Sequence, residues 1–85
     1  MNKYLRTPQE IIDLHGHTTA EAKIVLDDLI RSNHNYVRII VGKGNHSENG
    51  PVLREFVKKY FLSKNVHFNQ AKISDGGEGA LEVFL

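Results

Sequence analysis

Residues 10–41 carry the pattern of a strand, a helix and a second strand, and this pattern constrains the fold more than any other feature of the chain. The apolar pair Ile11 and Ile12 predicts a short buried strand over Glu10–Leu14. The capping-box pair Thr18 and Glu21 then predicts the start of a helix. The dense β-branched run Tyr36–Val41 is typical of a strand buried on both faces. Because such crossovers are right-handed and join parallel strands, both carboxyl ends should meet at one edge of a sheet.

The second half of the chain predicts one more helix and two more strands. Pro51 suits the first position of a helix, and an apolar stripe continues to about residue 62. Residues 66–73 indicate a weaker strand, 74–79 a flexible hairpin connection, and 80–85 the last strand. The predicted fold is an α/β, two-layer β-α-β-α-β-β sandwich. It has a four-stranded mixed sheet with two helices on one face, and its other face is partly open.

The overall composition is that of one small domain. Among the 85 residues, we expect 1–9 to be a flexible lead-in and 10–85 to form a single domain. The absence of cysteine excludes a disulfide framework and a thiolate metal site. Because the sequence has neither a signal-peptide core nor an apolar stretch of membrane-spanning length, a cytoplasmic protein away from membranes is expected. Nothing in the sequence demands a dimer, so a monomer is expected. The net charge is only +1, so any nucleic-acid footprint must be local.

Asp13 and His15 stand at the carboxyl end of the first predicted strand, where open α/β sheets bind ligands. Side chains two residues apart on a strand point to the same face, and a carboxylate beside an imidazole makes an acid–base pair. The structural alternative is that Asp13 caps a loop and His15 satisfies a backbone carbonyl. Another alternative places His15, His17 and His46 in a metal site, which ranks lower because no acidic cluster accompanies them.

The loop after the second predicted strand is rich in glycine and polar residues, Gly42-Lys43-Gly44-Asn45-His46-Ser47. Glycines let a backbone approach an anion closely, and Lys43 adds a positive charge. His46 and Ser47 can donate hydrogen bonds to phosphate oxygens. The spacing is not that of a P-loop, and a plain strand-to-helix connection is the structural alternative.

Two cations of the second predicted helix are candidates for a phosphate track. Arg54 and Lys58 share a helical face because they are four residues apart. If Pro51 begins the helix, Arg54 lies in its first turn, where the helix dipole disfavours a cation and a nearby phosphate would explain the placement. A solvated basic face is the alternative.

These motifs, in this order and spacing, resemble those of the Smr (small MutS-related) domain over residues 10–85. The matching segments are Ile12-Asp13-Leu14-His15-Gly16, the helix started by Thr18 and Glu21, Gly42-Lys43-Gly44-Asn45-His46-Ser47, Gly50-Pro51-Val52-Leu53 and Gly76-Gly77-Glu78-Gly79-Ala80-Leu81. The resemblance implies a fold similar to the C-terminal domain of bacterial translation initiation factor 3. It also implies nucleic-acid binding and, in several branches, endonuclease activity. Val41 stands where the family usually has Thr or His, and His46 is the expected replacement.

The leading hypothesis from this resemblance is an endonuclease that cuts RNA, at stalled ribosomes or in a larger nucleic-acid-processing assembly, with DNA nicking as a second activity. No cofactor is expected for RNA cleavage, whereas a divalent ion, Mg²⁺ or Mn²⁺, is expected for DNA. The expected catalytic residues are Asp13, His15 and His46, and the expected phosphate-binding residues are Gly16, Gly42, Lys43, Gly44, Asn45, Ser47, Arg54 and Lys58. The alternative is a non-catalytic module that binds RNA, DNA or the ribosome through the same loop edge.

Overall fold

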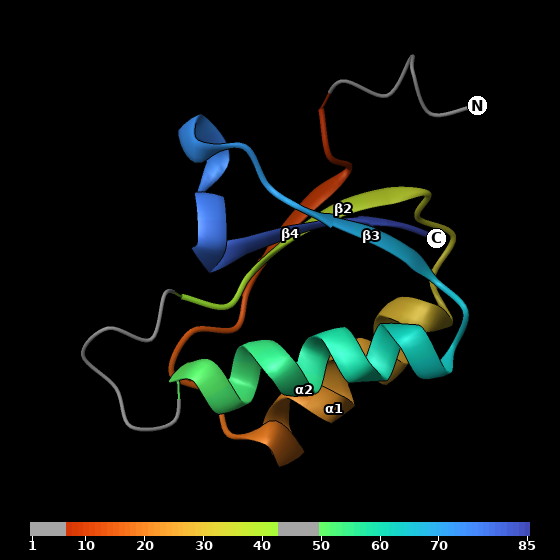
Figure 1. Ribbon diagram of the computed structural model, residues 1–85. Helices are drawn as coiled ribbons and strands as arrows, with labels where there is room; N and C mark the ends of the chain where they lie inside the picture. The colour runs from red at the N-terminus through yellow and green to blue at the C-terminus, as the bar shows by residue number, and fades with distance from the viewer. Residues whose placement is uncertain (1–6, 43–49) are drawn as a thin grey trace.

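The computed structural model describes residues 7–42 and 50–85, and these follow the predicted β-α-β-α-β-β order (Figure 1). The elements are β1 (Glu10–Asp13), α1 (Thr19–Ile30), β2 (Tyr36–Ile40), α2 (Gly50–Ser63), β3 (His67–Gln70), the 3₁₀ helices η2 (Ile73–Asp75) and η3 (Gly77–Gly79), and β4 (Ala80–Phe84). Thr18 and Glu21 form the predicted capping box, in which the hydroxyl accepts from the Glu21 N–H and the Glu21 carboxylate from the Thr18 N–H. The order of elements and the start of α1 are therefore confirmed.

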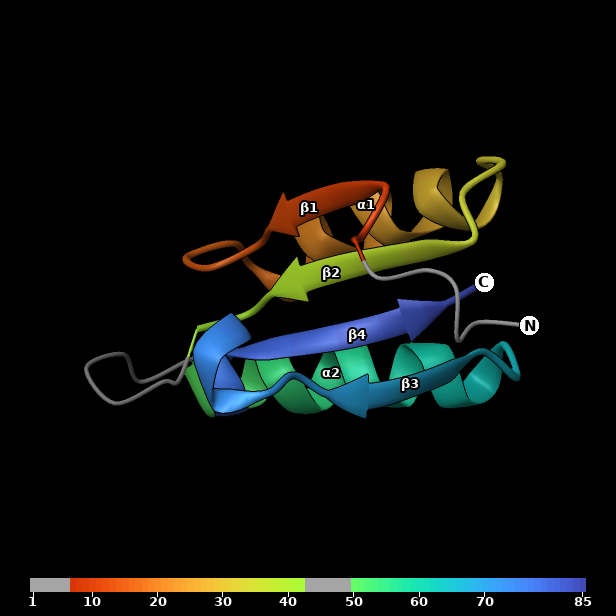
Figure 2. The ribbon, with the colours of Figure 1, turned by 90° about the horizontal axis from the view of Figure 1, so that it is seen from above.

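The four strands form one mixed sheet in the order β1-β2-β4-β3 (Figure 2). β1 and β2 are parallel, with Glu10 opposite Val37 and Asp13 opposite Ile40, while β4 is antiparallel to both β2 and β3. Both α-helices lie on one face of this sheet (Figure 1), and neither covers the opposite face. The predicted two-layer fold with its partly open sheet face is confirmed.

The core lies between the sheet and the two helices. Phe61 of α2, Leu26 of α1 and Ile39 of β2 are among its largest fully buried side chains. Val41, directly after β2, is also buried in this cluster. An apolar residue at position 41 therefore contributes to packing. Among the described residues no helix combines the length and apolar character that a membrane crossing requires.

Two details of the first predicted strand and the second predicted helix are corrected. Most of β1 is exposed, including Ile11, because β1 is an edge strand with solvent on its open face. Its helix-facing residue Ile12 packs against the core. α2 begins at Gly50, one residue before the predicted start, so Arg54 lies just beyond the first turn. The helix-dipole argument for a phosphate at Arg54 is correspondingly weaker.

The segment between α2 and the last strand differs most from prediction. The weak strand expected at 66–73 is shorter, as β3, and the connection at 74–79 forms two 3₁₀ turns instead of a flexible hairpin. The Lys72 carbonyl accepts hydrogen bonds from the N–H groups of Asp75 and Gly77, each at 2.8 Å. Gly76, at φ +123°, links the two turns in a conformation that favours glycine. These backbone bonds order the connection.

A hydrogen-bonded network on the open sheet face holds this connection to the sheet. The Arg38 guanidinium of β2 donates through Nε to both carboxylate oxygens of Glu82 on β4, at 3.0 and 3.1 Å. The Tyr36 hydroxyl donates to the same carboxylate at 2.9 Å. Arg38 also pairs with Asp75 of η2, at 3.6 Å between Nη2 and Oδ2. The network therefore joins β2, β4 and the β3–β4 connection.

Candidate acid–base site at the sheet edge

Leu14 anchors the end of β1 and thereby fixes the direction of its two polar neighbours. Its side chain is buried in the core, and its N–H donates to the Ile40 carbonyl of β2 at 2.7 Å. The chain then turns, because the His17 N–H donates back to the Leu14 carbonyl at 2.9 Å, with Gly16 at φ +81°. The residues on either side of Leu14 consequently face solvent at the edge where both parallel strands end.

Asp13 and His15 make direct contact at this edge. The Nδ1 atom of the imidazole lies 2.6 Å from Oδ1 of the carboxylate, which also accepts the His15 backbone N–H at 3.0 Å. The first of these hydrogen bonds, helped by the second, holds the pKa of Asp13 below its ordinary value. Both side chains are more than half exposed, at 54% for Asp13 and 70% for His15. The predicted pairing on one face is confirmed, and the histidine's partner is this carboxylate.

The contact leaves the imidazole oriented for proton transfer. When Nδ1 donates to a carboxylate, the neutral ring presents Nε2 as an acceptor, and the carboxylate supports the cation that forms when Nε2 takes a proton. Because the ring is exposed, Nε2 is accessible to a large ligand. The arrangement therefore suits a general base or acid acting on a polymer at the protein surface.

Gly42 lies beside this pair, as the parallel arrangement of β1 and β2 predicts. A Cβ atom added at Gly42 would stand 3.5 Å from the His15 Cβ, and the Gly42 φ of +79° favours glycine. The Gly79 carbonyl of η3 accepts the N–H groups of Val41 and Gly42 at 2.8 and 3.0 Å. The start of the glycine loop is thus supported by the β3–β4 connection.

Sequence reasoning assigned no role to Gly79. The glycine cluster at 76–79 was a sequence signal of a constrained backbone, but its contact partner is 37 residues away and could not be read from local pattern. The other expected site residues of the loop lie outside the described residues: Lys43, Gly44, Asn45, His46 and Ser47. Their predicted roles remain predictions.

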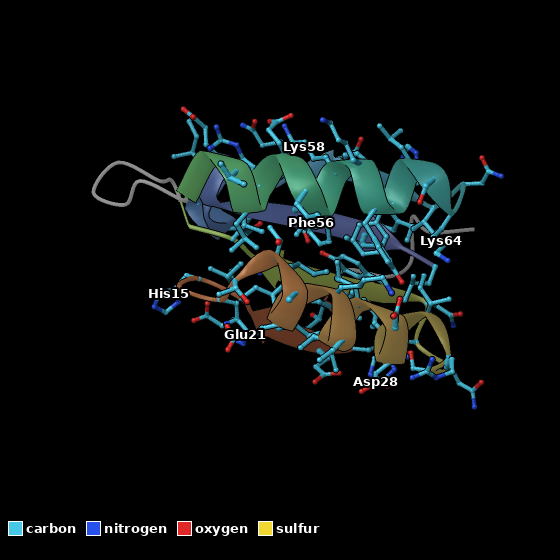
Figure 3. The ribbon with its side chains drawn as sticks, turned by 90° about the horizontal axis from the view of Figure 1, so that it is seen from below. His15, Glu21, Asp28, Phe56, Lys58 and Lys64 are labelled. Atoms are coloured by element: carbon cyan, nitrogen blue, oxygen red, sulfur yellow. The ribbon has the colours of Figure 1, made fainter. Side chains whose placement is uncertain are left out.

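Arg54 and Lys58 both lie on α2 and share a carboxylate neighbour there. Glu55 Oε2 stands 4.0 Å from Arg54 Nε and 3.9 Å from Lys58 Nζ. Figure 3 shows Lys58 on the side of α2 that faces away from α1, whereas His15 lies near the beginning of α1. A phosphate track that includes Lys58 would therefore run along the side of α2 that faces away from α1.

The metal alternative gains no support within residues 7–42 and 50–85. In these ranges no group of three or more histidine or acidic side chains is arranged to hold a metal ion. His46, which that alternative requires beside His15 and His17, lies outside them.

Fold and site together define a small two-layer α/β domain with an acid–base pair where its parallel strands end. A family model described as the Smr domain matches residues 12–85. The chain belongs to the Smr domain family, which is associated with endonuclease activity and with nucleic-acid binding.

Solved structures of Smr domains have the same fold. The Smr domain of Thermus thermophilus MutS2 superposes with a TM-score of 0.76 at 28% identity, covering 89% of this chain and 96% of that one. The human small-MutS related domain superposes with a TM-score of 0.66 at 30% identity, covering 87% of this chain and 98% of that one.

Relatives at the sequence level are longer proteins. A Treponema pallidum protein is 42% identical over 95% of this chain and 44% of its own length. Human NEDD4-binding protein 2 is 32% identical over 92% of this chain but only 5% of its own length. The chain thus spans less than half of these relatives, and its similarity to them concerns this domain.

Proposed function

We propose that this domain is an endonuclease that cuts RNA, with DNA as a second substrate. The observation that carries the proposal is the 2.6 Å contact between His15 Nδ1 and Asp13 Oδ1, exposed beside Gly42 at the sheet edge. Family membership supports it, because the Smr family is associated with endonuclease activity. Stalled ribosomes, or a larger nucleic-acid-processing assembly in the cytoplasm, are the proposed setting, and the domain itself is proposed to be monomeric.

On RNA, the proposed reaction uses the substrate's own 2′-hydroxyl as the nucleophile. His15 Nε2 takes the 2′-hydroxyl proton, the O2′–P bond forms, and the P–O5′ bond breaks to leave a 2′,3′-cyclic phosphate. Asp13 holds the ring and supports its cationic form. In this proposal the leaving O5′ receives a proton from His46 or Lys43 of the glycine-rich loop.

The glycines flanking the pair are proposed to admit the scissile phosphate. Gly16 and Gly42 both have positive φ, and nothing lies within 4 Å of a Cβ added at Gly16. Backbone close to these glycines can approach phosphate oxygens without side chains in between. Lys43, Gly44, Asn45 and Ser47 would complete the phosphate-binding loop, with charge from Lys43 stabilising the transition state.

On DNA there is no 2′-hydroxyl, so water must attack the phosphorus. A divalent ion such as Mg²⁺ or Mn²⁺ would supply Lewis acidity and lower the pKa of that water. Asp13 provides one carboxylate at the site, which fits Mg²⁺ because this ion takes few protein ligands and fills its shell with phosphate oxygens and water.

The test uses matched end-labelled RNA and DNA oligonucleotides, incubated with either magnesium or EDTA. RNA cleavage should continue in EDTA and yield cyclic phosphate ends, and His15→Ala should slow it at least ~100-fold. His67→Ala is the matched control, because His67 is an exposed histidine on β3. Equal cleavage by the His15→Ala variant would refute the assignment. Salt-sensitive binding of RNA or ribosomes without cleavage by the wild type would instead support the non-catalytic binding module.

A further inference from the structure

An open cleft lies between the beginning of α1 and the first three turns of α2, on the helical face of the molecule. It has a volume of about 460 Å³ and is lined by Thr19 of α1 and by Val52, Glu55, Phe56 and Lys59 of α2. Figure 3 shows Phe56 on the side of α2 that faces α1. The proposed chemistry at the sheet edge uses none of these side chains.

The cleft adjoins the acid–base site. Thr19 is the first residue of α1 and follows His15 by four positions, so their Cα atoms are at most about 14 Å apart. The turn closed by the His17 N–H and the Leu14 carbonyl shortens this path. On the opposite side, α2 follows the loop that begins at Gly42, beside His15. A strand bound at His15 therefore has the cleft within reach.

The lining suits a flat, partly apolar group with polar edges. Phe56 is half-buried and packs against the core, while Val52 is 55% exposed. Lys59 and Glu55 add a donor and an acceptor. Unpaired bases bind in such places, with a face against aromatic or apolar side chains and an edge against polar groups.

The charge of α2 favours a nucleic acid over an apolar protein segment. The helix carries three cations, Arg54, Lys58 and Lys59, against the single carboxylate of Glu55. Lys59 is the one of these cations that lines the cleft, so a strand whose base enters the cleft would bring its phosphates close to Lys59.

We propose that the cleft binds an unpaired base of the substrate strand, close to the scissile phosphate, and so selects single-stranded sites. This inference rests on the proposed function, because it takes the strand cut at His15 as the ligand. The base is withdrawn from stacking with its neighbours and placed against Val52 and Phe56. A base held in a duplex cannot enter, so paired RNA is a poor substrate.

The test combines a protein change with a change in the RNA. Val52→Glu puts a charge in the cleft without disturbing the core, since Val52 is exposed and glutamate is a good helix former. Leu62→Glu is the matched control, because Leu62 is 65% exposed on the same helix and does not line the cleft. The substrates are one single-stranded RNA and a series of its copies, each with one abasic residue near the cleavage point.

We expect one abasic position to slow the wild type and the Leu62→Glu variant at least about fivefold. Val52→Glu should slow cleavage of the intact RNA by a similar factor and should be insensitive to that abasic residue. Equal rates for Val52→Glu and wild type, or an unchanged abasic effect in Val52→Glu, would overturn the proposal. If an apolar segment of a protein partner is the natural occupant, Val52→Glu and wild type should cleave the RNA at equal rates.

A binding measurement separates this inference from the nuclease activity. A DNA oligonucleotide carrying 2-aminopurine is titrated with the His15→Ala variant, and stacking in the cleft should change its fluorescence. The change should disappear when Val52→Glu is added and should persist with Leu62→Glu. If wild type cleaves no RNA but this pattern is seen, the cleft stands and the nuclease assignment fails. If RNA is cleaved but the fluorescence change survives Val52→Glu, only the cleft proposal fails.

Discussion

Replacing Glu82 by glutamine should weaken the sheet by removing the charge that Arg38 faces. The side chains of Arg38 and Glu82 are only 14% and 13% exposed. The two oxygens of Glu82 share the Nε–H of Arg38, at 3.0 and 3.1 Å, and one of them also accepts from the Tyr36 hydroxyl at 2.9 Å. Glutamine keeps the size of the side chain but loses the charge and one acceptor, while Arg38 keeps Asp75 at 3.6 Å.

The expected loss follows from this geometry. A hydrogen bond to a charged group contributes about 1.5–3 kcal/mol, and breaking a fully buried ion pair costs about 3–5 kcal/mol. Because Asp75 and some water still reach Arg38, the lower end applies, and we expect about 2 kcal/mol. For a domain of this size the melting temperature should fall by about 8–16 °C.

Urea unfolding followed by far-ultraviolet circular dichroism measures this loss. The dependence of the free energy of unfolding on urea concentration should have the same slope in variant and wild type, which checks that the unfolding transition is unchanged. Glu55→Gln is the control, because Glu55 is 57% exposed and its ion pairs with Lys58 and Arg54 are long, at 3.9 and 4.0 Å. This variant should change the free energy of unfolding by less than about 0.5 kcal/mol. The double variant Arg38→Met with Glu82→Met removes both charges and should cost less than Glu82→Gln alone. A Glu82→Gln variant as stable as the Glu55→Gln control would refute the reasoning.

Three further predictions concern the site and its supports. The pKa of Asp13 is lowered by its bond to His15, so the stability from this bond is present above the ordinary aspartate pKa and lost as pH falls through the lowered value. Carboxyl NMR titration of the His15→Ala variant should therefore find the Asp13 pKa closer to the ordinary aspartate value than in the wild type. The same Asp13 pKa in both proteins would contradict this. Gly76→Ala should lower the free energy of unfolding in urea by about 1–3 kcal/mol. The φ of residue 76 is +123°, and its new Cβ would lie 2.8 Å from the Cβ of Ala80. Gly77→Asn should cost less than about 1 kcal/mol, because Gly77 has a φ of +54° and nothing lies within 4 Å of its added Cβ. If Gly76→Ala and Gly77→Asn lost the same free energy of unfolding, the predicted clash at Gly76 would be refuted. Burial, followed by the bond to a carboxylate, raises the pKa of Tyr60 to about 12, so stability should fall between about pH 10 and 12, and a Tyr60→Phe variant should lack this fall.

The features that the sequence predicted well depend on residues close together in the chain. The capping box joins Thr18 and Glu21, three positions apart, and the acid–base contact joins Asp13 and His15, two positions apart. The parallel approach of β1 and β2 was also predictable, because a helical crossover between strands has one preferred hand. The same arguments predict that Gly42 lies near His15, and the structure confirms this.

The misjudged features depend on position within the sheet. Glu10–Leu14 is apolar enough for a buried strand, but β1 became an edge strand because β4 pairs with β2 on its other side. The segment 66–73 has β-forming residues, yet the backbone bonds to the Lys72 carbonyl end the strand early and form 3₁₀ turns. Such bonds leave no periodic pattern in the sequence.

The order of elements, the helix start at Thr18 and the pairing of Asp13 with His15 can be predicted from the sequence, because each follows from interactions over a few residues or from chain handedness. The contact of Arg38 with Glu82 and the support that Gly79 gives to Gly42 depend on the packing of distant segments. The cleft lined by Thr19 of α1 and by Val52 and Phe56 of α2 likewise depends on how the two helices pack. These contacts join residues more than thirty positions apart, and strand order and helix packing, not local pattern, bring them together.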